Sequence, residues 1–475
     1  MTVTAEAYRP AQNFAAKRMG RLGTVMVAIL VFTVACVYLS EALALCSLLV
    51  LSCSIHLIGK SAEVFNLRRI TILSFWYLTY LVMILVPSFI VFSDHYGPYR
   101  GPYLFGVESV LVTVPLGALF IGKLCGFRVD ETNRYFESKI QEDSDTRRLR
   151  RRALILLVVI LAITIEYFRE VKTIPLFYML ANPGEHAALA LLRDEAFKLL
   201  DSPFSYIYFI TRTVLYPFLI VLLLGWWMRS RDKRWLWPLV IAAGSGLLFA
   251  GASGAKAPVA AIFLIVALFL YLYYRGSLSR KMVTVFLLLI WIFPAGVVYV
   301  SYLTPEITAK DIGRALGQRV FYLPAEVVYY YFEVFPADTP YLHGRSVDKL
   351  ARIFDLHPFD TANYVGLYAY PQYHLDSISA NGAFIADLNA DFGLAGVLAG
   401  GLIAGSIMQL LHIYLVRRAK TIANLVCYAY LVCAFWLLHS TSLPIVLASD
   451  GAILILLLSF VFRKPRPRLV GAIRS

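Results

Sequence analysis

Charged residues are scarce in this sequence: Asp, Glu, Lys and Arg make up 16% of its 475 residues, whereas hydrophobic types make up 59%. This composition argues against an ordinary soluble protein, because runs of about 18 or more apolar residues mark helices that cross a membrane. We therefore expect an all-α polytopic membrane protein with about twelve transmembrane helices. The predicted spans, of which the fifth is short, are 22–39, 42–59, 70–92, 104–122, 153–167, 205–228, 235–252, 257–274, 282–303, 392–415, 422–439 and 444–462.

Cysteine is rare as well, and all six cysteines lie in predicted spans or in the loop at 123–152. None falls in a predicted outer loop, so we expect no external disulfide. The sequence has no CxxC motif or Cys/His cluster, and it has no P-loop or glycine-rich dinucleotide fingerprint. It therefore predicts neither a metal nor a nucleotide cofactor.

Acidic residues are outnumbered by basic ones, 30 to 44, which gives a formal net charge of +14. The basic residues gather in alternate loops, a distribution that marks the cytoplasmic side of a membrane protein. Both termini are then cytoplasmic, and the basic face contacts anionic lipid of the bilayer rather than nucleic acid. The main clusters are Lys60/Arg68/Arg69, Arg147–Arg152, Arg229–Arg234, Arg275/Arg280/Lys281 and Arg417–Lys420.

Two long connections face outward on this topology, and each is expected to contain short helices. They divide the chain into three membrane parts and two outer loops. The predicted parts are helices 1–5 (residues 1–167), an outer loop (168–204), helices 6–9 (205–303), a large outer loop (304–391), and helices 10–12 with a cytoplasmic tail (392–475).

Ionisable residues inside predicted spans are costly, so each is a candidate for function. All of them fall near the outer edge of the bilayer, which suggests a shared polar cavity, although each can also be a structural partner of another. At Lys256 the stretch GASGAKAP precedes a predicted helix, and free backbone N–H groups there favour an anion such as phosphate. A lysine that merely anchors the headgroup region fits equally well. The candidates are Glu108, Glu166, Arg212, Lys256 and Asp450.

Aromatic residues are concentrated in the large outer loop, in VFYLPAEVVYYYFEVFP and ANYVGLYAYPQYHLD. This density is typical of sugar stacking, and also of a helix lying among lipid headgroups. Pro324 suits the first turn of a helix, on which Glu326, Tyr330 and Glu333 share one face. The candidate sugar contacts are Tyr322, Tyr330 and Tyr373.

An outer anion site, sugar-stacking aromatics and no nucleotide motif together indicate a glycan carried on polyprenyl diphosphate. The diphosphate is the leaving group in sugar transfer, and cationic side chains stabilise its charge without a metal. A carboxylate or histidine supplies the general base for the acceptor hydroxyl.

Three segments resemble the Wzy-type polymerases, which join oligosaccharide repeat units of bacterial surface polysaccharides. They are RVFYLPAEVVYYYFEVFP at 319–336, YLHGRS at 341–346 and NGAFIADLNADFGLAG at 381–396, and the resemblance covers roughly 205–415. It implies a GT-C-like, metal-independent glycosyltransferase in the bacterial inner membrane, with a periplasmic active site, an undecaprenyl-diphosphate-linked substrate and a chain-length regulator as partner. It also implies that Arg319 and Arg345 bind the diphosphate, to which the membrane argument adds Arg212 and Lys256.

The related O-antigen ligases use an outer histidine late in the chain, which favours His374 as the general base, with Glu326 and Asp391 as rivals. O-antigen ligase activity, with transfer to the lipid A core, is one alternative function. A flippase or other transporter is another, although the sequence lacks the internal repeat common in transporters. A non-catalytic assembly protein is a third.

Overall fold

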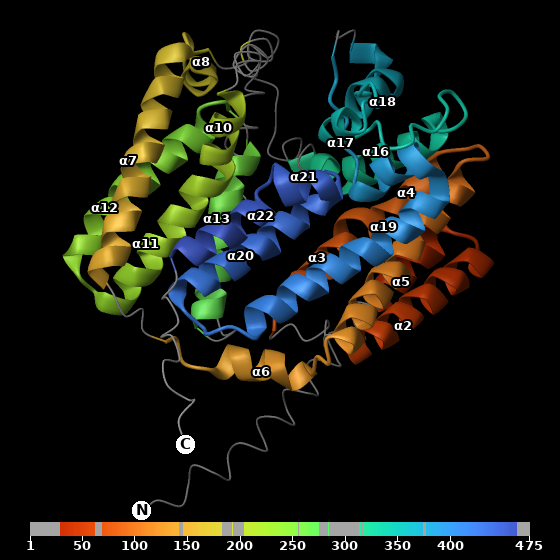
Figure 1. Ribbon diagram of the computed structural model, residues 1–475. Helices are drawn as coiled ribbons and strands as arrows, with labels where there is room; N and C mark the ends of the chain where they lie inside the picture. The colour runs from red at the N-terminus through yellow and green to blue at the C-terminus, as the bar shows by residue number, and fades with distance from the viewer. Residues whose placement is uncertain are drawn as a thin grey trace, which may run out of the picture.

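A computed structural model describes residues 29–61, 69–141, 146–182, 204–254, 256–274, 317–373 and 377–462, with isolated positions between them. These residues form helices and connecting turns, and none of them belongs to a strand. The protein is thus an all-α membrane protein, built from two groups of helices joined by a buried central helix (Figure 1).

The first group of helices packs around the pair formed by α5 and α19. Both helices place small residues at their contact: a Cβ atom added to Gly405 would overlap the backbone oxygen of Val114, and one on Gly117 would overlap that of Leu402. Small side chains let two helix backbones approach closely, which is how helices in a membrane gain packing contacts. The group comprises α2 (Glu41–Ser61), α3 (Ile72–Tyr80), η1 (Leu81–Leu85), α4 (Val86–Asp94), α5 (Arg100–Leu124) and α19 (Phe384–Val416).

The second group lies on the other side of α20 (Ile422–Trp436), which contacts α3 of the first group and α11 and α13 of the second. All but one of the residues of α20 are buried, as expected for a hydrophobic helix surrounded by other helices. The second group comprises α7 (Thr146–Glu170), α8 (Pro175–Ala181), α10 (Ser205–Ile210), η3 (Thr211–Leu215), α11 (Tyr216–Ser230), α12 (Lys233–Gly251) and α13 (Lys256–Tyr273). Three shorter elements follow α20: η6 (Leu437–His439), α21 (Leu443–Ala448) and α22 (Ala452–Val461).

Seven helical segments among the described residues are long and apolar enough to cross a membrane: Ile72–Asp94, Arg100–Leu124, Ser205–Ser230, Lys233–Gly251, Phe384–Val416, Ile422–His439 and Leu443–Val461. This supports a membrane protein but not the expected count of twelve spans. Three predicted spans correspond to shorter apolar helices: Ile29–Tyr38, Glu41–His56 and Ala257–Tyr273. The predicted fifth span lies in α7, where Arg152 and Glu166 bound an apolar stretch too short to cross the hydrocarbon core. The ninth, 282–303, lies outside the described residues apart from position 284.

α19 is interrupted at Gly393, whose backbone adopts φ 64° and ψ −157°. This conformation suits glycine because it has no Cβ, and a Cβ there would lie only 2.8 Å from the hydroxyl of Tyr341. The longer part of α19 packs along α5. The part before Gly393 contacts residues 318–373, which belong to the predicted large outer loop and are called the outer segment below.

The outer segment covers one end of the first group, and the helix α6 (Val129–Glu137) lies at the opposite end (Figure 1). Helix α16 of the outer segment begins at Leu323 with Pro324 in the first turn, close to the predicted start, and packs on α4, α5, α18 and α19. The segment comprises η4 (Gln318–Tyr322), α16 (Leu323–Val334), α17 (Asp348–Ile353), α18 (Thr361–Ala369) and η5 (Pro371–Tyr373).

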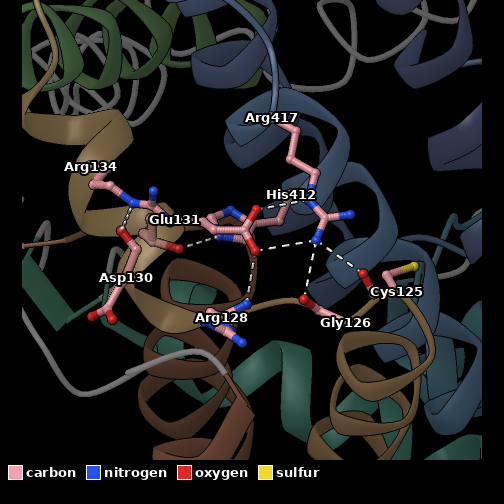
Figure 2. A network of polar contacts seen from close by, with 9 residues as sticks. Cys125, Gly126, Arg128, Asp130, Glu131, Arg134, His412 and Arg417 are labelled. Atoms are coloured by element: carbon pink, nitrogen blue, oxygen red, sulfur yellow. Dashed lines mark hydrogen bonds and ion pairs between the residues drawn. The ribbon is translucent and has the colours of Figure 1, made fainter.

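The amphipathic helix α6 (Val129–Glu137) lies across the opposite end of the molecule and is held by Arg417, just after α19 (Figures 1 and 2). The Arg417 guanidinium donates two hydrogen bonds to Glu131, from Nε to Oε2 at 2.8 Å and from Nη2 to Oε1 at 3.2 Å. Nη2 also donates to the backbone oxygen of Cys125 at 3.0 Å. These hydrogen bonds lower the pKa of Glu131 below its usual value and raise that of Arg417.

Candidate functional site

Glu326 lies on α16 and accepts a hydrogen bond of 3.0 Å from the hydroxyl of Tyr370. Its other carboxylate oxygen lies 3.7 Å from Nε2 of His95, which follows directly after α4. Only 16% of the Glu326 side chain and 21% of the His95 side chain are exposed. A carboxylate and an imidazole are thus paired in a largely desolvated position at the outer end of the first helix group.

Tyrosine rings surround this pair. The His95 ring stacks on Tyr329 with the centroids 4.2 Å apart, and the edge of Tyr330 approaches His95 at 5.5 Å. Tyr330 also meets Tyr368 at 6.4 Å and Tyr370 at 5.9 Å. These rings fix the orientation of His95 and offer flat apolar surfaces of the kind on which sugars stack.

Tyr322 completes the group by donating a 3.0 Å hydrogen bond to Oδ2 of Asp94, the last residue of α4. Burial, followed by the nearby charge of Glu326, raises the pKa of the Tyr322 phenol and raises that of Tyr330 to about 12. Both phenols therefore stay protonated, and the Tyr322 hydroxyl acts as a hydrogen-bond donor. The Glu326 cluster is defined here as Asp94, His95, Tyr322, Glu326, Tyr329, Tyr330, Tyr368 and Tyr370.

A polar pocket of about 380 Å³ lies on another face of α16, at Tyr331. Three carboxylates line it, together with hydroxyl and amide groups, and no Lys, Arg or His does. Such a lining repels a diphosphate but matches the hydroxyl groups of a sugar. The polar residues of this acidic pocket are Ser346, Asp348, Asp360, Thr361, Asn381, Asp387, Ser440 and Thr441, besides Tyr331.

Asp391 lies beside the acidic pocket and holds the turn at 342–346. Its carboxylate accepts hydrogen bonds from the backbone N–H groups of Gly344 at 2.9 Å and Ser346 at 3.2 Å, and from the Ser346 hydroxyl. His343 and Gly344 have positive φ angles of 53° and 94°, so these bonds stabilise a turn that the backbone disfavours for His343. Asp391 is thereby engaged as a positioning residue for Ser346 rather than as an exposed base.

The two arginines of the outer segment differ in their surroundings. Arg345 is half-buried, donates from Nε to the backbone oxygen of His357 at 2.8 Å, and lies 5.9 Å from the ring centroid of Phe359. Arg319 is exposed and lies in the π-helical turn η4. π-helical turns are rare and often occur at functional sites.

Arg212 and Lys256 belong to the second helix group. Arg212 lies in another π-helical turn, η3, and donates from Nη1 to the hydroxyl of Ser253 at 3.2 Å. That serine belongs to the turn between α12 and α13, and Lys256 is the first residue of α13. The structure therefore brings Arg212 to the stretch that contains Lys256. The elements that carry Arg319 and Arg345 belong to the outer segment above the first group (Figure 1).

Two predicted residues cannot be placed in the site. His374 lies outside the described residues, and Tyr373 is known only as the last backbone position of η5.

The other ionisable residues of the spans have separate surroundings. Glu108 accepts a hydrogen bond from Ser47 of α2, and Glu166 pairs with Arg169 at 3.0 Å. Asp450 lies at the break between α21 and α22.

The sequence analysis missed the pairing of His95 with Glu326, as well as Asp94, Tyr370 and Asp387. His95 and Asp94 follow the predicted third span on its outer side, which was the available signal. Within the described residues, no group of three His, Cys, Asp or Glu side chains is placed to hold a metal ion. Comparison with protein-family models, curated proteins and solved structures found no match to this chain.

Proposed function

We propose that the protein is a polymerase that joins undecaprenyl-diphosphate-linked oligosaccharide repeat units into a surface polysaccharide. The observation that carries the proposal is the Glu326–His95 pair within a tyrosine-lined site, and a pocket suited to sugar hydroxyls lies on another face of the same helix. The proposal includes a bacterial inner-membrane location, cytoplasmic termini, a periplasmic active site and a GT-C-like fold. The seven apolar helices and the basic clusters in alternate loops support a membrane enzyme of this orientation.

In the proposed reaction, the reacting acceptor sugar lies at the Glu326 cluster, and another sugar of the acceptor oligosaccharide occupies the acidic pocket. Its hydroxyl oxygen forms a bond to the anomeric carbon of the donor sugar, and the bond from that carbon to the diphosphate oxygen breaks. The hydroxyl proton passes to the Glu326–His95 pair, which acts as general base. The lipid-linked diphosphate departs as an anion.

Cationic side chains stabilise this leaving group, because arginine matches the geometry of phosphate oxygens. Arg319 is the best placed of the four predicted cations, since η4 contacts α16 and its Tyr322 belongs to the Glu326 cluster. Arg212 and Lys256 then serve a part of the lipid-linked substrate that lies against the second helix group.

The test adds purified lipid-linked repeat units to the purified protein in detergent or nanodiscs. A polymerase gives a ladder of products of increasing length, whereas a ligase gives one transfer onto a lipid A core. Glu326→Gln is expected to abolish the ladder. If folded wild-type protein forms no product from authentic substrate, the polymerase assignment is rejected.

One observation favours a transporter of lipid-linked glycans as a second candidate. The last apolar helix is interrupted between α21 and α22, and Tyr430 hydrogen-bonds both to this interruption and to the π-helical turn η3. Its hydroxyl lies 2.7 Å from the backbone oxygen of Asp450 and 3.1 Å from that of Thr213. Interrupted helices are common at transporter substrate sites. A transporter would move the lipid-linked substrate across liposomes without forming any new glycosidic bond.

A further inference from the structure

A groove with a volume of about 600 Å³ lies at the beginning of α7, far from the outer segment. Arginines and aliphatic side chains line it: Arg147, Arg150, Arg151, Leu154, Ile155, Val158 and Val159 from α7, and Arg234 from the first turn of α12. We call it the α7 groove. α7 runs from this end of the molecule to α8 at the opposite end (Figure 1).

The lining residues follow one stripe of α7 in a fixed order. Positions 147, 150, 151, 154, 155 and 158 follow the pattern i, i+3, i+4, i+7, i+8 and i+11, which places them on one face of a helix. The arginines occupy the first turns and the aliphatic residues the next two. At a rise of about 1.5 Å per residue, the aliphatic part extends about 12 Å beyond Arg151. The groove is therefore cationic where α7 begins and apolar farther along the helix.

Among the described residues, the cationic part has little charge compensation. Arg234 has Asp232 at 4.0 Å, but the described residues provide no ion pair for the three arginines of α7. The Nε of Arg150 is also buried without a hydrogen-bond acceptor among the described residues. A buried donor of this kind is costly unless an acceptor occupies the groove.

The apolar part faces outward. Ile155, Val158 and Val159 are 55%, 65% and 47% exposed, as expected for apolar side chains of a helix that faces lipid. Exposed apolar side chains next to a cluster of arginines match a molecule that has an anionic head and hydrocarbon chains.

We propose that the α7 groove binds an anionic phospholipid, with its phosphate among the arginines and its acyl chains along Leu154–Val159. The site is independent of the proposed sugar transfer, because it lies on different elements and at the opposite end of the molecule. It fixes the first turns of α7 against α12 at one leaflet of the bilayer.

Native mass spectrometry of the detergent-purified protein tests this, with phosphatidylglycerol and phosphatidylcholine of identical acyl chains as the probes. We expect phosphatidylglycerol to bind more tightly. Each arginine near an anionic lipid contributes about a fivefold gain in affinity, so the triple variant R147Q/R150Q/R151Q should bind roughly a hundredfold more weakly. Arg169→Gln, at the far end of the same helix, is the matched control and should bind like wild type.

Val158→Trp provides a second variant that keeps every charge, and so applies even if the triple variant does not fold. The indole would fill the apolar part of the groove and lower phosphatidylglycerol affinity. Equal affinity for the two lipids, or unchanged binding by Val158→Trp and the triple variant, would overturn the proposal. Displacement of phosphatidylglycerol by free pyrophosphate at equal concentration would also overturn it, because the site would then recognise a soluble anion.

Discussion

The imidazole Nε2 of His95 lies 3.7 Å from the carboxylate of Glu326, and this contact joins the end of α4 to the outer segment. Tyr370 donates to the same carboxylate, so Glu326 is held from two directions. Among the described residues, the arrangement holds a carboxylate and an imidazole next to each other at the end of the molecule opposite α6.

Replacing the Glu326 carboxylate should reduce sugar transfer more than it reduces stability. Glu326→Gln keeps a hydrogen-bond acceptor for Tyr370 but removes the charge beside His95, so we expect a loss of roughly 100-fold or more in kcat. His95→Gln should give a similar loss. Product formation from lipid-linked repeat units measures both effects. Glu137→Gln, in α6 at the opposite end of the molecule, is the control, and equal loss in this variant would contradict a specific role for Glu326.

The two outer arginines should separate binding from stability. Arg319→Ala removes an exposed side chain, so we expect weaker donor binding, seen as a KM raised roughly tenfold or more, with a smaller loss of melting temperature than Arg345→Ala. Arg345→Ala should lower the melting temperature as well, because Arg345 holds the backbone of His357. Arg169→Ala is the control, since this side chain is 74% exposed and pairs with Glu166 in its own helix, α7. Unchanged KM in Arg319→Ala would remove Arg319 from the site.

The acidic pocket can be tested at Asp387, whose carboxylate accepts a hydrogen bond from Thr361 at 3.3 Å. Asp387→Asn keeps the size of the side chain and replaces one oxygen acceptor for sugar hydroxyls with an N–H donor. We expect acceptor KM to rise roughly tenfold, because a sugar hydroxyl left without its acceptor costs about 1–3 kcal/mol. Asp355→Asn, outside the pocket lining, should leave KM unchanged. An unchanged acceptor KM in Asp387→Asn would show that the acceptor binds elsewhere.

The contact between α5 and α19 predicts a stability effect that is independent of function. Gly405→Ala forces a methyl group onto the backbone oxygen of Val114, and we expect a loss of about 1–3 kcal/mol. Gly244→Ala is the matched control in α12, because its added methyl group meets no atom within 4 Å. That control should be neutral or gain up to about 1 kcal/mol. Thermal unfolding in detergent measures both, and equal stability of the two variants would contradict the close packing.

The Glu131–Arg417 contact predicts a stability effect that depends on pH. The pKa of Glu131 is lowered by its hydrogen bonds to Arg417, so folding favours the charged carboxylate. The stabilisation is present above the unfolded value of 4.5 and is lost as the pH falls through the lower folded value. Glu131→Gln should therefore melt at a lower temperature than wild type at pH 7, and the difference should shrink below pH 4.5. Asp130→Asn, on the same helix, should show a smaller difference, and a gap that widens in acid would contradict this account.

Apolar periodicity predicted the membrane helices well where one helix spans the bilayer. The expected span 104–122 lies within Arg100–Leu124, and 205–228 begins where the structure begins it. The expected span 392–415 starts one residue before the interruption at Gly393, and further helical residues precede this break, back to Phe384. Hydropathy does not report such a break, since the break depends on the backbone conformation of a single residue.

The site was predicted only where its residues are close in the sequence. Tyr322, Glu326 and Tyr330 recur every four residues, and all three belong to the Glu326 cluster. Tyr322 and Asp94 are separated by 228 positions, so their contact depends on how α16 packs against α4. The acidic pocket escaped prediction for the same reason, because Ser440 and Asp360 come from distant segments.

α19 continues through Gly393 without a linker, so the part of the helix that contacts the outer segment and the part that packs along α5 belong to one continuous element. Phe384 and Ile385 are fully buried, and they lie on the same helix that continues along α5. Cutting the chain before or after Gly393 would expose these side chains to water. Antibodies or nanobodies against this surface must therefore be selected on the whole protein in a bilayer mimic, not on an excised fragment.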